Sequence, residues 1–432
     1  MLGKIGLVAI TLALAVLFAV GFEVGRAGLA NYLQAHPAPP MVGPGATLRQ
    51  QLESVARVPP KSDEGAALRD RGLLALRQAR ATADPTYYRQ AEQALNGALA
   101  QRPNDPDVLV GLGTLALARH QFADGLAWGE RARDAAPKRA APYGVIGDAL
   151  VELGRYDEAF DAVQTMVDLR PDLASYTRVS YMRELQGDLD GAVEAMRRAV
   201  DAGGGAGEPV AWARVQLGHL LLQRGDVAGA EREYRWAQAA DPGNMAALAG
   251  LGRARLAAGD AEAAIPFYAQ AVERYPLPEL VVTLGDLYES VGRHEDAARQ
   301  FELARTLQQL VAANGGNVDL ELALFEAERG DAGRAVQLAE AELARRPSIH
   351  VYDALAWARY NAGDYQAARE ASQQARQLGT RDGLMLFHAG MIELKLGQPA
   401  AARALLSQAL AANPAFSARW APEARRLLGV LP

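Results

Sequence analysis

Small and apolar residues recur at fixed intervals along most of this chain. Glycine returns every 33, 34 or 38 residues, and alanine stands five positions after each of these glycines. In most cases a second alanine follows seven positions later. Self-similarity at a period of this size is typical of repeat architectures, in which each repeat is one supersecondary unit. The repeat glycines are Gly154, Gly187, Gly225, Gly259, Gly292, Gly330, Gly363 and Gly397.

The spacing predicts two antiparallel helices, A and B, in each unit. The repeat glycine ends helix A in a left-handed conformation, and a proline often ends helix B because it cannot donate the next backbone hydrogen bond. The alanines lie where the two helices cross, and a larger residue between them, such as Tyr234 or Phe301, fills the gap to the next unit. Because one unit cannot cover its own apolar face, we expect the units to stack into a superhelix.

These positions resemble the tetratricopeptide repeat family. The best matches to its pattern are Leu217-Gly218 with Gly225, Ala230, Tyr234, Ala237 and Pro242, and Leu284-Gly285 with Tyr288, Gly292, Ala297, Phe301 and Ala304. The resemblance implies an all-α fold, a right-handed superhelical solenoid of antiparallel helix pairs. About ten units are predicted within residues 62–416. They are 72–105, 106–139, 140–172, 173–206, 211–244, 245–277, 278–311, 316–348, 349–382 and 383–416.

Two intervals of 38 residues contain glycine-rich insertions, at 203–207 and 314–317. A glycine run can hold a phosphate when a helix start and a Lys, Ser or Thr follow it, but Glu208 and Pro209 follow the first run. We interpret both insertions as linkers at which the superhelix bends. Residues 417–432 are predicted to form a helix that caps the end of the stack.

The chain begins with an uncharged apolar run at residues 5–22. This run would span about 27 Å as a helix, close to the ~30 Å of a hydrocarbon core. Residues 1–24 are therefore predicted to form a transmembrane anchor, with a cleaved signal sequence ending at Ala30 as the alternative. Residues 25–61 are rich in proline and predict an extended stalk, in which 46–58 form a short amphipathic helix.

Composition excludes several classes of function. The 45 Lys and Arg residues are outnumbered by 51 Asp and Glu residues, which argues against a nucleic-acid-binding protein. Because there is no cysteine, disulfides, thiolate zinc sites and cysteine nucleophiles are excluded. The six histidines are scattered, and no two are spaced for a shared metal ion. We find no catalytic, nucleotide or cofactor motif and expect no enzyme activity, no metal and no cofactor.

In the family that the repeats resemble, helix A lines the inner face of the superhelix. The exposed positions lie ten, six, three and two residues before the repeat glycine. The Lys and Asn clamp with which chaperone-binding members hold a carboxylate is not found at these positions. Aromatic residues cluster there in the last units, and such residues commonly anchor peptide partners. Packing between adjacent units is the alternative. The predicted partner-binding residues are Asp353, Trp357, Tyr360, Asn361, Phe387, Met391, Tyr181, His219 and Arg253.

We expect a non-enzymatic scaffold that binds protein or peptide segments in its groove and is tethered to a membrane by its N-terminal helix. The charge of Lys4 favours a cytoplasmic N-terminus, which would place the solenoid outside the cytoplasm. Anchor and repeats together are similar in layout to the lipopolysaccharide assembly protein B type, although that type adds a cysteine-ligated metal module that this chain cannot form. Envelope assembly or export fits this arrangement. There are two alternatives to this membrane-tethered scaffold: a secreted repeat protein, and a regulator that recruits an enzyme to the membrane. A hydrolase or transferase would need a non-repeating block of about 100 residues, which the sequence does not contain.

Overall fold

The computed structural model describes residues 63–82, 86–205, 207–313 and 319–431. These residues form 21 helices and contain no strand. The even-numbered helices from α4 to α22 are the A helices of successive pairs: α4 (Glu64–Thr82), α6 (Pro106–Ala118), α8 (Ala140–Glu152), α10 (Leu173–Leu185), α12 (Glu208–Gln223), α14 (Met245–Ala257), α16 (Pro278–Ser290), α18 (Asp319–Arg329), α20 (Ile349–Asn361) and α22 (Gly383–Lys395). The odd-numbered helices are their B partners: α5 (Thr86–Gln101), α7 (Phe122–Ala135), α9 (Tyr156–Leu169), α11 (Leu189–Ala202), α13 (Val227–Ala240), α15 (Ala261–Arg274), α17 (His294–Ala313), α19 (Ala332–Arg345), α21 (Tyr365–Ala375) and α23 (Pro399–Ala412). A last helix, α24 (Trp420–Leu428), follows the ten pairs.

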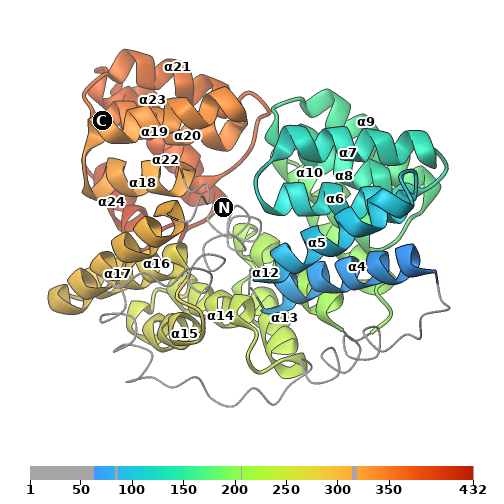
Figure 1. Cartoon of the computed structure of the whole chain (residues 1–432). Coiled ribbons are helices and arrows are strands. Elements are labelled where there is room, and N and C mark those ends of the chain that lie inside the picture. The colour runs from blue at the N-terminus through green and yellow to red at the C-terminus, as the bar shows by residue number, and fades with distance from the viewer. Residues whose placement is uncertain (1–62, 83–85, 206, 314–318, 432) are drawn as a thin grey trace.

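Each A helix packs against its own B helix, and most B helices pack against the A helix that follows, so the all-helical solenoid predicted from the sequence is confirmed. The pairs follow the chain in order and curve round in space (Figure 1). The predicted anchor, the stalk and its short helix lie outside the described residues. Within the described ranges, no helix combines the length and the apolar character that crossing a bilayer requires.

The repeat glycines end the A helices in the predicted way. Seven of the eight have positive φ values, between 71° and 84°. His120 takes the same place in the pair α6–α7, with φ of 58°. The prediction is wrong for Gly330, which does not have a positive φ. There the carboxylate of Glu326 accepts the N–H of Asp331 at 3.0 Å, so a side chain completes the turn after α18.

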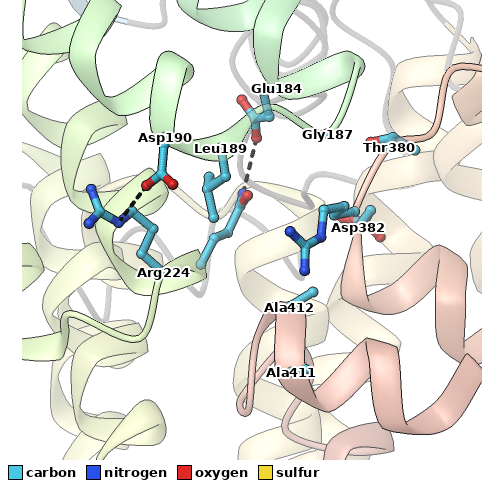
Figure 2. A pocket seen from close by; sticks show the side chains of 11 residues that line it. Glu184, Gly187, Leu189, Asp190, Arg224, Thr380, Asp382, Ala411 and Ala412 are labelled. Atoms are coloured by element: carbon cyan, nitrogen blue, oxygen red, sulfur yellow. Dashed lines mark hydrogen bonds and ion pairs between the residues drawn. The ribbon is translucent and has the colours of Figure 1, made fainter. Parts of the chain in front are cut away.

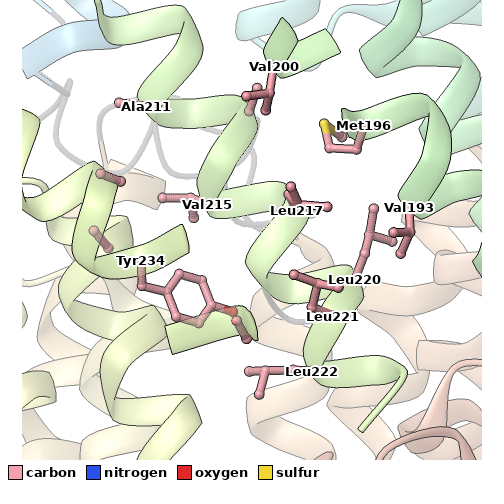
Figure 3. Packing of buried hydrophobic residues seen from close by; sticks show 14 of the residues in the cluster. Val193, Met196, Val200, Ala211, Val215, Leu217, Leu220, Leu221, Leu222 and Tyr234 are labelled. Carbon is pink, nitrogen blue, oxygen red and sulfur yellow. The ribbon is translucent and has the colours of Figure 1, made fainter. Parts of the chain in front are cut away.

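Close approach of the helices depends on glycine opposite a large side chain. The ring of Tyr234, on α13, lies between Gly218 of its own A helix and Gly250 of the next one. A Cβ atom at either glycine would lie 2.5 Å from the ring, closer than atoms can approach. Figure 3 shows this ring among the apolar side chains of α11 and α12. The larger residue of helix B therefore fills the gap between units, as predicted.

The two ends of the solenoid and the two glycine-rich insertions depart from the regular succession of helix pairs. Helix α4 begins ahead of the predicted first unit, and the Asp63 carboxylate accepts the N–H of Ala66 at 3.1 Å at its start. Glu208, which follows the first glycine-rich insertion, pairs through its carboxylate with Arg80 of α4 at 2.7 Å. The second insertion, 314–317, lies outside the described residues. The predicted capping helix is present as α24, and the hydroxyl oxygen of Ser417 accepts the N–H of Trp420 at 3.1 Å.

Candidate functional site

The aromatic cluster that the sequence places at the C-terminal units lies in the interior. Trp357 is 2% exposed and Phe387 is fully buried. The Trp357 ring stacks on Tyr360 with 4.7 Å between centroids, and on His388 with 4.1 Å. Both carboxylate oxygens of the buried Asp353 lie 3.1 Å from Nδ1 of His388. These side chains hold α20 and α22 together.

The cluster is covered by Trp420, the first residue of α24. Its ring stacks on Phe387 with 5.4 Å between centroids and meets Trp357 edge-on at 5.7 Å. Its Nε1 donates to Oε1 of Glu328, on α18, at 3.1 Å. Trp420 was absent from the predicted site residues. It follows Phe387 by one repeat length, which is the sequence signal that could have placed it beside the cluster.

The remaining predicted residues of these units lie at the edge of the cluster. Met391 is half-buried against it, and the exposed Asn361 donates from Nδ2 to the carbonyl oxygen of Trp357 at 2.8 Å. Trp357 and Phe387 pack between adjacent units, which is the alternative to partner binding that the sequence left open. A partner-binding role for this cluster stays a prediction.

The middle of the solenoid presents a row of side chains that are only partly covered. His219 and Arg253 come from α12 and α14, and Nη1 of the arginine lies 3.4 Å from both ring nitrogens of the histidine. Tyr234 Oη lies 2.7 Å from Nδ1 of the same histidine. Burial would lower the pKa of Arg253, but the neighbouring Tyr268, Tyr234 and Glu279 outweigh it and raise that pKa.

We define the central face by residues at the predicted inner positions of α12, α14 and α16. They are His219, Gln223, Arg253, Leu256, Ala257 and Glu289, all half-exposed or exposed. Two carboxyl groups adjoin this face on α16. Burial raises the pKa of Glu279 to about 8, and Glu321 adds to the effect. Burial likewise raises the pKa of Asp286 to about 7, although the Arg329 guanidinium pairs with it and opposes the shift.

Segments far apart in the chain meet at what we call the first lateral contact. The turn after α8 lies against the segment that precedes α20, and a Cβ atom on Gly154 would lie 2.5 Å from the carbonyl oxygen of Pro347. Arg346 is 4% exposed and lies between two carboxylates. It reaches Glu152 at 2.9 Å and also pairs with Glu342. Burial would lower the pKa of Arg346, but these carboxylates raise it.

A second lateral contact follows one unit later. A Cβ atom on Gly187, after α10, would lie 2.5 Å from the carbonyl oxygen of Gly379, before α22. Tyr181, which the sequence assigns to the partner surface, lies between the two contacts. Its Oη is 3.4 Å from Nε2 of His350 on α20, so this side chain joins the two arms of the curve.

A pocket of about 210 Å³ opens beside the second lateral contact. Figure 2 shows it between the turn after α10 and the start of α22. Gln223 donates from Nε2 to Glu184 at 3.0 Å, and Asp190 pairs with Arg224 at 3.3 Å on its wall. The lining residues are Glu184, Gly187, Leu189, Asp190, Gln223, Arg224, Thr380, Arg381, Asp382, Ala411 and Ala412. Over the described part of the chain, no three His, Asp or Glu side chains are grouped as metal ligands would be.

Comparison with known proteins decides the family. The profile of the Tetratricopeptide repeat family matches residues 86–140, 145–207, 215–277, 354–415 and 387–431, which is more than half of the chain. The chain belongs to the tetratricopeptide repeat family. Tetratricopeptide repeat proteins bind peptides or other proteins, and the fold generally serves as a non-enzymatic scaffold.

Two curated relatives come from Komagataeibacter xylinus. Cellulose synthase operon protein C is 26% identical over 364 residues, and cellulose synthase 1 operon protein C is 23% identical over 339 residues. These matches cover 80% and 78% of this chain, but only 24% and 22% of the relatives. The chain therefore spans about a quarter of the length of these tetratricopeptide repeat relatives.

Solved structures are similar at the level of the fold. A thermophilic tetratricopeptide repeat protein of Thermus thermophilus is 20% identical, with a TM-score of 0.38, and covers 43% of this chain and 99% of its own. A tetratricopeptide repeat protein of Parabacteroides merdae is 18% identical, with a TM-score of 0.35, and covers 60% of this chain and 97% of its own.

Proposed function

We propose that this tetratricopeptide repeat protein is a non-enzymatic scaffold that holds a segment of a partner protein against its central face. One observation carries the proposal. Helices α12, α14 and α16 present adjacent side chains that stay partly exposed, whereas the corresponding aromatics of α20 and α22 are buried beneath Trp420. A partner segment could lie along this row without displacing any part of the described chain.

The central face is built to keep its shape. Arg253 is held against His219, and Tyr234 fixes the histidine from the other side. The two lateral contacts join the arms on either side of this face and hold the curve of the solenoid. A preformed surface binds more tightly than a mobile one because less conformational entropy is lost on association.

A location at the cell envelope is the second part of the proposal. Its support is the apolar run at residues 5–22, which is long enough to tether the scaffold to a membrane. The names of the two relatives connect them with cellulose synthase operons, and a role in assembling a synthesis or export machine for an envelope polymer fits a tethered scaffold. N-terminal sequencing of the mature protein distinguishes the tethered form from a secreted one.

Affinity capture with matched variants tests the scaffold. The test variant combines Ala257→Glu and Glu289→Lys, two changes on the central face, and the control is Arg197→Glu on the exposed side of α11. We expect a protein captured from detergent-solubilised membranes by the wild type and by the control, and lost with the double variant. Circular dichroism establishes that all three chains are folded. Identical capture by the folded double variant would contradict the proposal.

A further inference from the structure

Two arginines of A helices are each neutralised by an aspartate of the A helix before them. Arg178 of α10 donates to both carboxylate oxygens of Asp148 on α8, from Nη2 at 2.6 Å and from Nε at 2.9 Å. Arg329 of α18 pairs with Asp286 on α16. Both aspartates stand six positions before the repeat glycine of their unit. A carboxylate at this position therefore serves as the counter-charge of an arginine on the following A helix.

Arg253 of α14 has no such aspartate. The residue six positions before the repeat glycine of α12 is His219, and Nη1 of Arg253 lies 3.4 Å from both of its ring nitrogens. Arg253 also donates a hydrogen bond to the hydroxyl of Tyr268. Within the described part of the chain, no carboxylate forms an ion pair with this guanidinium. Arg253 is thus a half-exposed cation of the central face whose contacts are made by ring side chains.

A carboxyl group does lie near Arg253, but it does not neutralise the charge. Burial raises the pKa of Glu279 to about 8, and Glu321 adds to the effect, so this carboxyl is protonated near neutral pH. A partly buried cation without a counter-ion has lost part of its hydration and gained no ion pair in return. The stabilisation that Asp148 and Asp286 give to their arginines is therefore available at Arg253 to a carboxylate from another molecule.

We propose that Arg253 binds the carboxylate of an aspartate or glutamate side chain in the partner segment. The inference rests on the proposed function, because the carboxylate must come from a protein segment on the central face. The planar guanidinium can donate to both oxygens of one carboxylate, as Arg178 does to Asp148.

The position of Arg253 favours a side-chain carboxylate over the end of a chain. Arg253 is flanked by His219 on α12 and Glu289 on α16, so a segment that crosses the central face continues on both sides of it. The exposed carboxylate of Glu289 repels a second acidic group placed beside it. The segment is therefore expected to carry one acidic residue at this place, and not an acidic run.

Binding of matched peptides to the purified full chain tests the inference. The probes are the acetylated and amidated peptide Leu-Ala-Glu-Ala-Leu, the same peptide with glutamine in place of glutamate, and the glutamine peptide with a free C-terminal carboxylate, each followed by ligand-observed NMR. We expect the glutamate probe to bind about threefold more tightly than the amidated glutamine probe, as a partly exposed ion pair provides. About 0.5 M NaCl should weaken this preference, because salt screens exposed charges.

Variants connect the preference to Arg253. Arg253→Gln should abolish the preference for glutamate, whereas Arg253→Lys, which keeps the charge without the planar fork, should retain part of it. The matched control is Arg232→Gln, at an exposed position of α13, which should leave the preference unchanged. Circular dichroism establishes that each variant is folded. If Arg253→Gln does not fold, the lysine variant and the salt dependence still decide.

Equal binding of the glutamate and amidated glutamine probes to the wild type, or a preference that survives in the folded Arg253→Gln variant, would overturn the inference. A free C-terminal carboxylate that strengthens binding more than the glutamate does would overturn the assignment to a side chain. These results are separate from the capture experiment. A partner that is captured by the wild type and lost with the double variant of the central face supports the scaffold even when glutamate brings no preference.

Discussion

The hydroxyl oxygen of Tyr156 accepts a hydrogen bond from the backbone N–H of Ile349 at 2.7 Å, across 193 positions of sequence. The bond joins the start of α9 to the start of α20, and both residues are buried. It lies beside the ion pairs of Arg346, so a polar network at the first lateral contact joins two arms of the solenoid that are far apart along the chain.

Removing the hydroxyl should weaken this junction. We expect Tyr156→Phe to lower the free energy of unfolding by about 1–3 kcal/mol, because the buried N–H of Ile349 loses its acceptor. Hydrogen exchange at the Ile349 amide should become faster. Tyr143→Phe is the matched control, since the hydroxyl of Tyr143 bonds to Pro137 at an exposed site. If the two substitutions lower the free energy of unfolding by the same amount, the hydrogen bond between Tyr156 and Ile349 does not stabilise the junction.

Arg346 is expected to be the more sensitive member of the first lateral contact. Arg346→Ala leaves the partly buried carboxylate of Glu152 without its guanidinium and leaves the buried Glu342 paired with Arg345 alone, and removing one partner of a buried ion pair typically costs about 3–5 kcal/mol. Small-angle scattering should also show a larger radius of gyration if the arms separate. As control, Arg139→Ala removes an exposed pair with Asp107, which is worth at most about 1 kcal/mol. An unchanged unfolding midpoint for Arg346→Ala would argue against the contact.

The repeat positions made the helix pairs predictable, but not the contacts between distant pairs. Glycine and alanine at fixed intervals report on the crossing of neighbouring helices, and Gly218 beside Tyr234 behaves as the pattern predicts. The hydrogen bond between Tyr156 and Ile349 forms because each repeat is rotated slightly relative to the one before it, and these rotations add up until distant repeats meet. The sequence pattern within one repeat does not predict that sum. The pocket at Thr380 has the same origin and was not predicted.

The burial of the candidate site residues was also not predictable from the positions within one repeat. The inner positions were assigned from the family's spacing, which predicted that Trp357 faces a groove. The spacing does not say what covers that position, and here Trp420 covers it. Trp357→Ala would therefore remove a core side chain, at a cost of about 3–5 kcal/mol, and could not by itself report on partner binding. His219 and Arg253, on α12 and α14, stay partly exposed in the part of the chain that the structure describes.

Overpacking at the crossing of two helices gives a test of the repeat geometry. Ala264 is fully buried on α15, where its carbonyl oxygen would lie 3.3 Å from a Cβ atom on Gly252. We expect Ala264→Leu to force α14 and α15 apart and to lower the free energy of unfolding by about 1–3 kcal/mol. The control is Ala298→Leu at an exposed position of α17, where such changes stay within about 0.5 kcal/mol. Comparable midpoints for the two variants would reject the placement of Ala264 at the crossing.

The raised pKa of Glu279 predicts a loss of stability as the pH rises. Burial lifts the pKa of this carboxyl from its ordinary value of 4.5 to about 8, so the folded chain holds a proton that the unfolded chain releases near pH 4.5. The stabilising contribution is complete below pH 4.5, falls as the pH rises from there to 8, and changes no further above that. One pKa unit corresponds to about 1.4 kcal/mol, so a fall of at least that size is expected.

Glu279→Gln should remove this pH dependence, because the amide keeps the shape of the protonated carboxyl and cannot ionise. Urea unfolding at pH 5 and at pH 8.5 measures the effect, and the difference between the two midpoints should be smaller in the variant than in the wild type. Glu273→Gln, at an exposed position of α15, is the matched control and should retain the wild-type difference. If Glu279→Gln and the wild type lose stability equally between the two pH values, Glu279 is already ionised in the folded chain near neutral pH, and the burial assigned to its carboxyl is too deep.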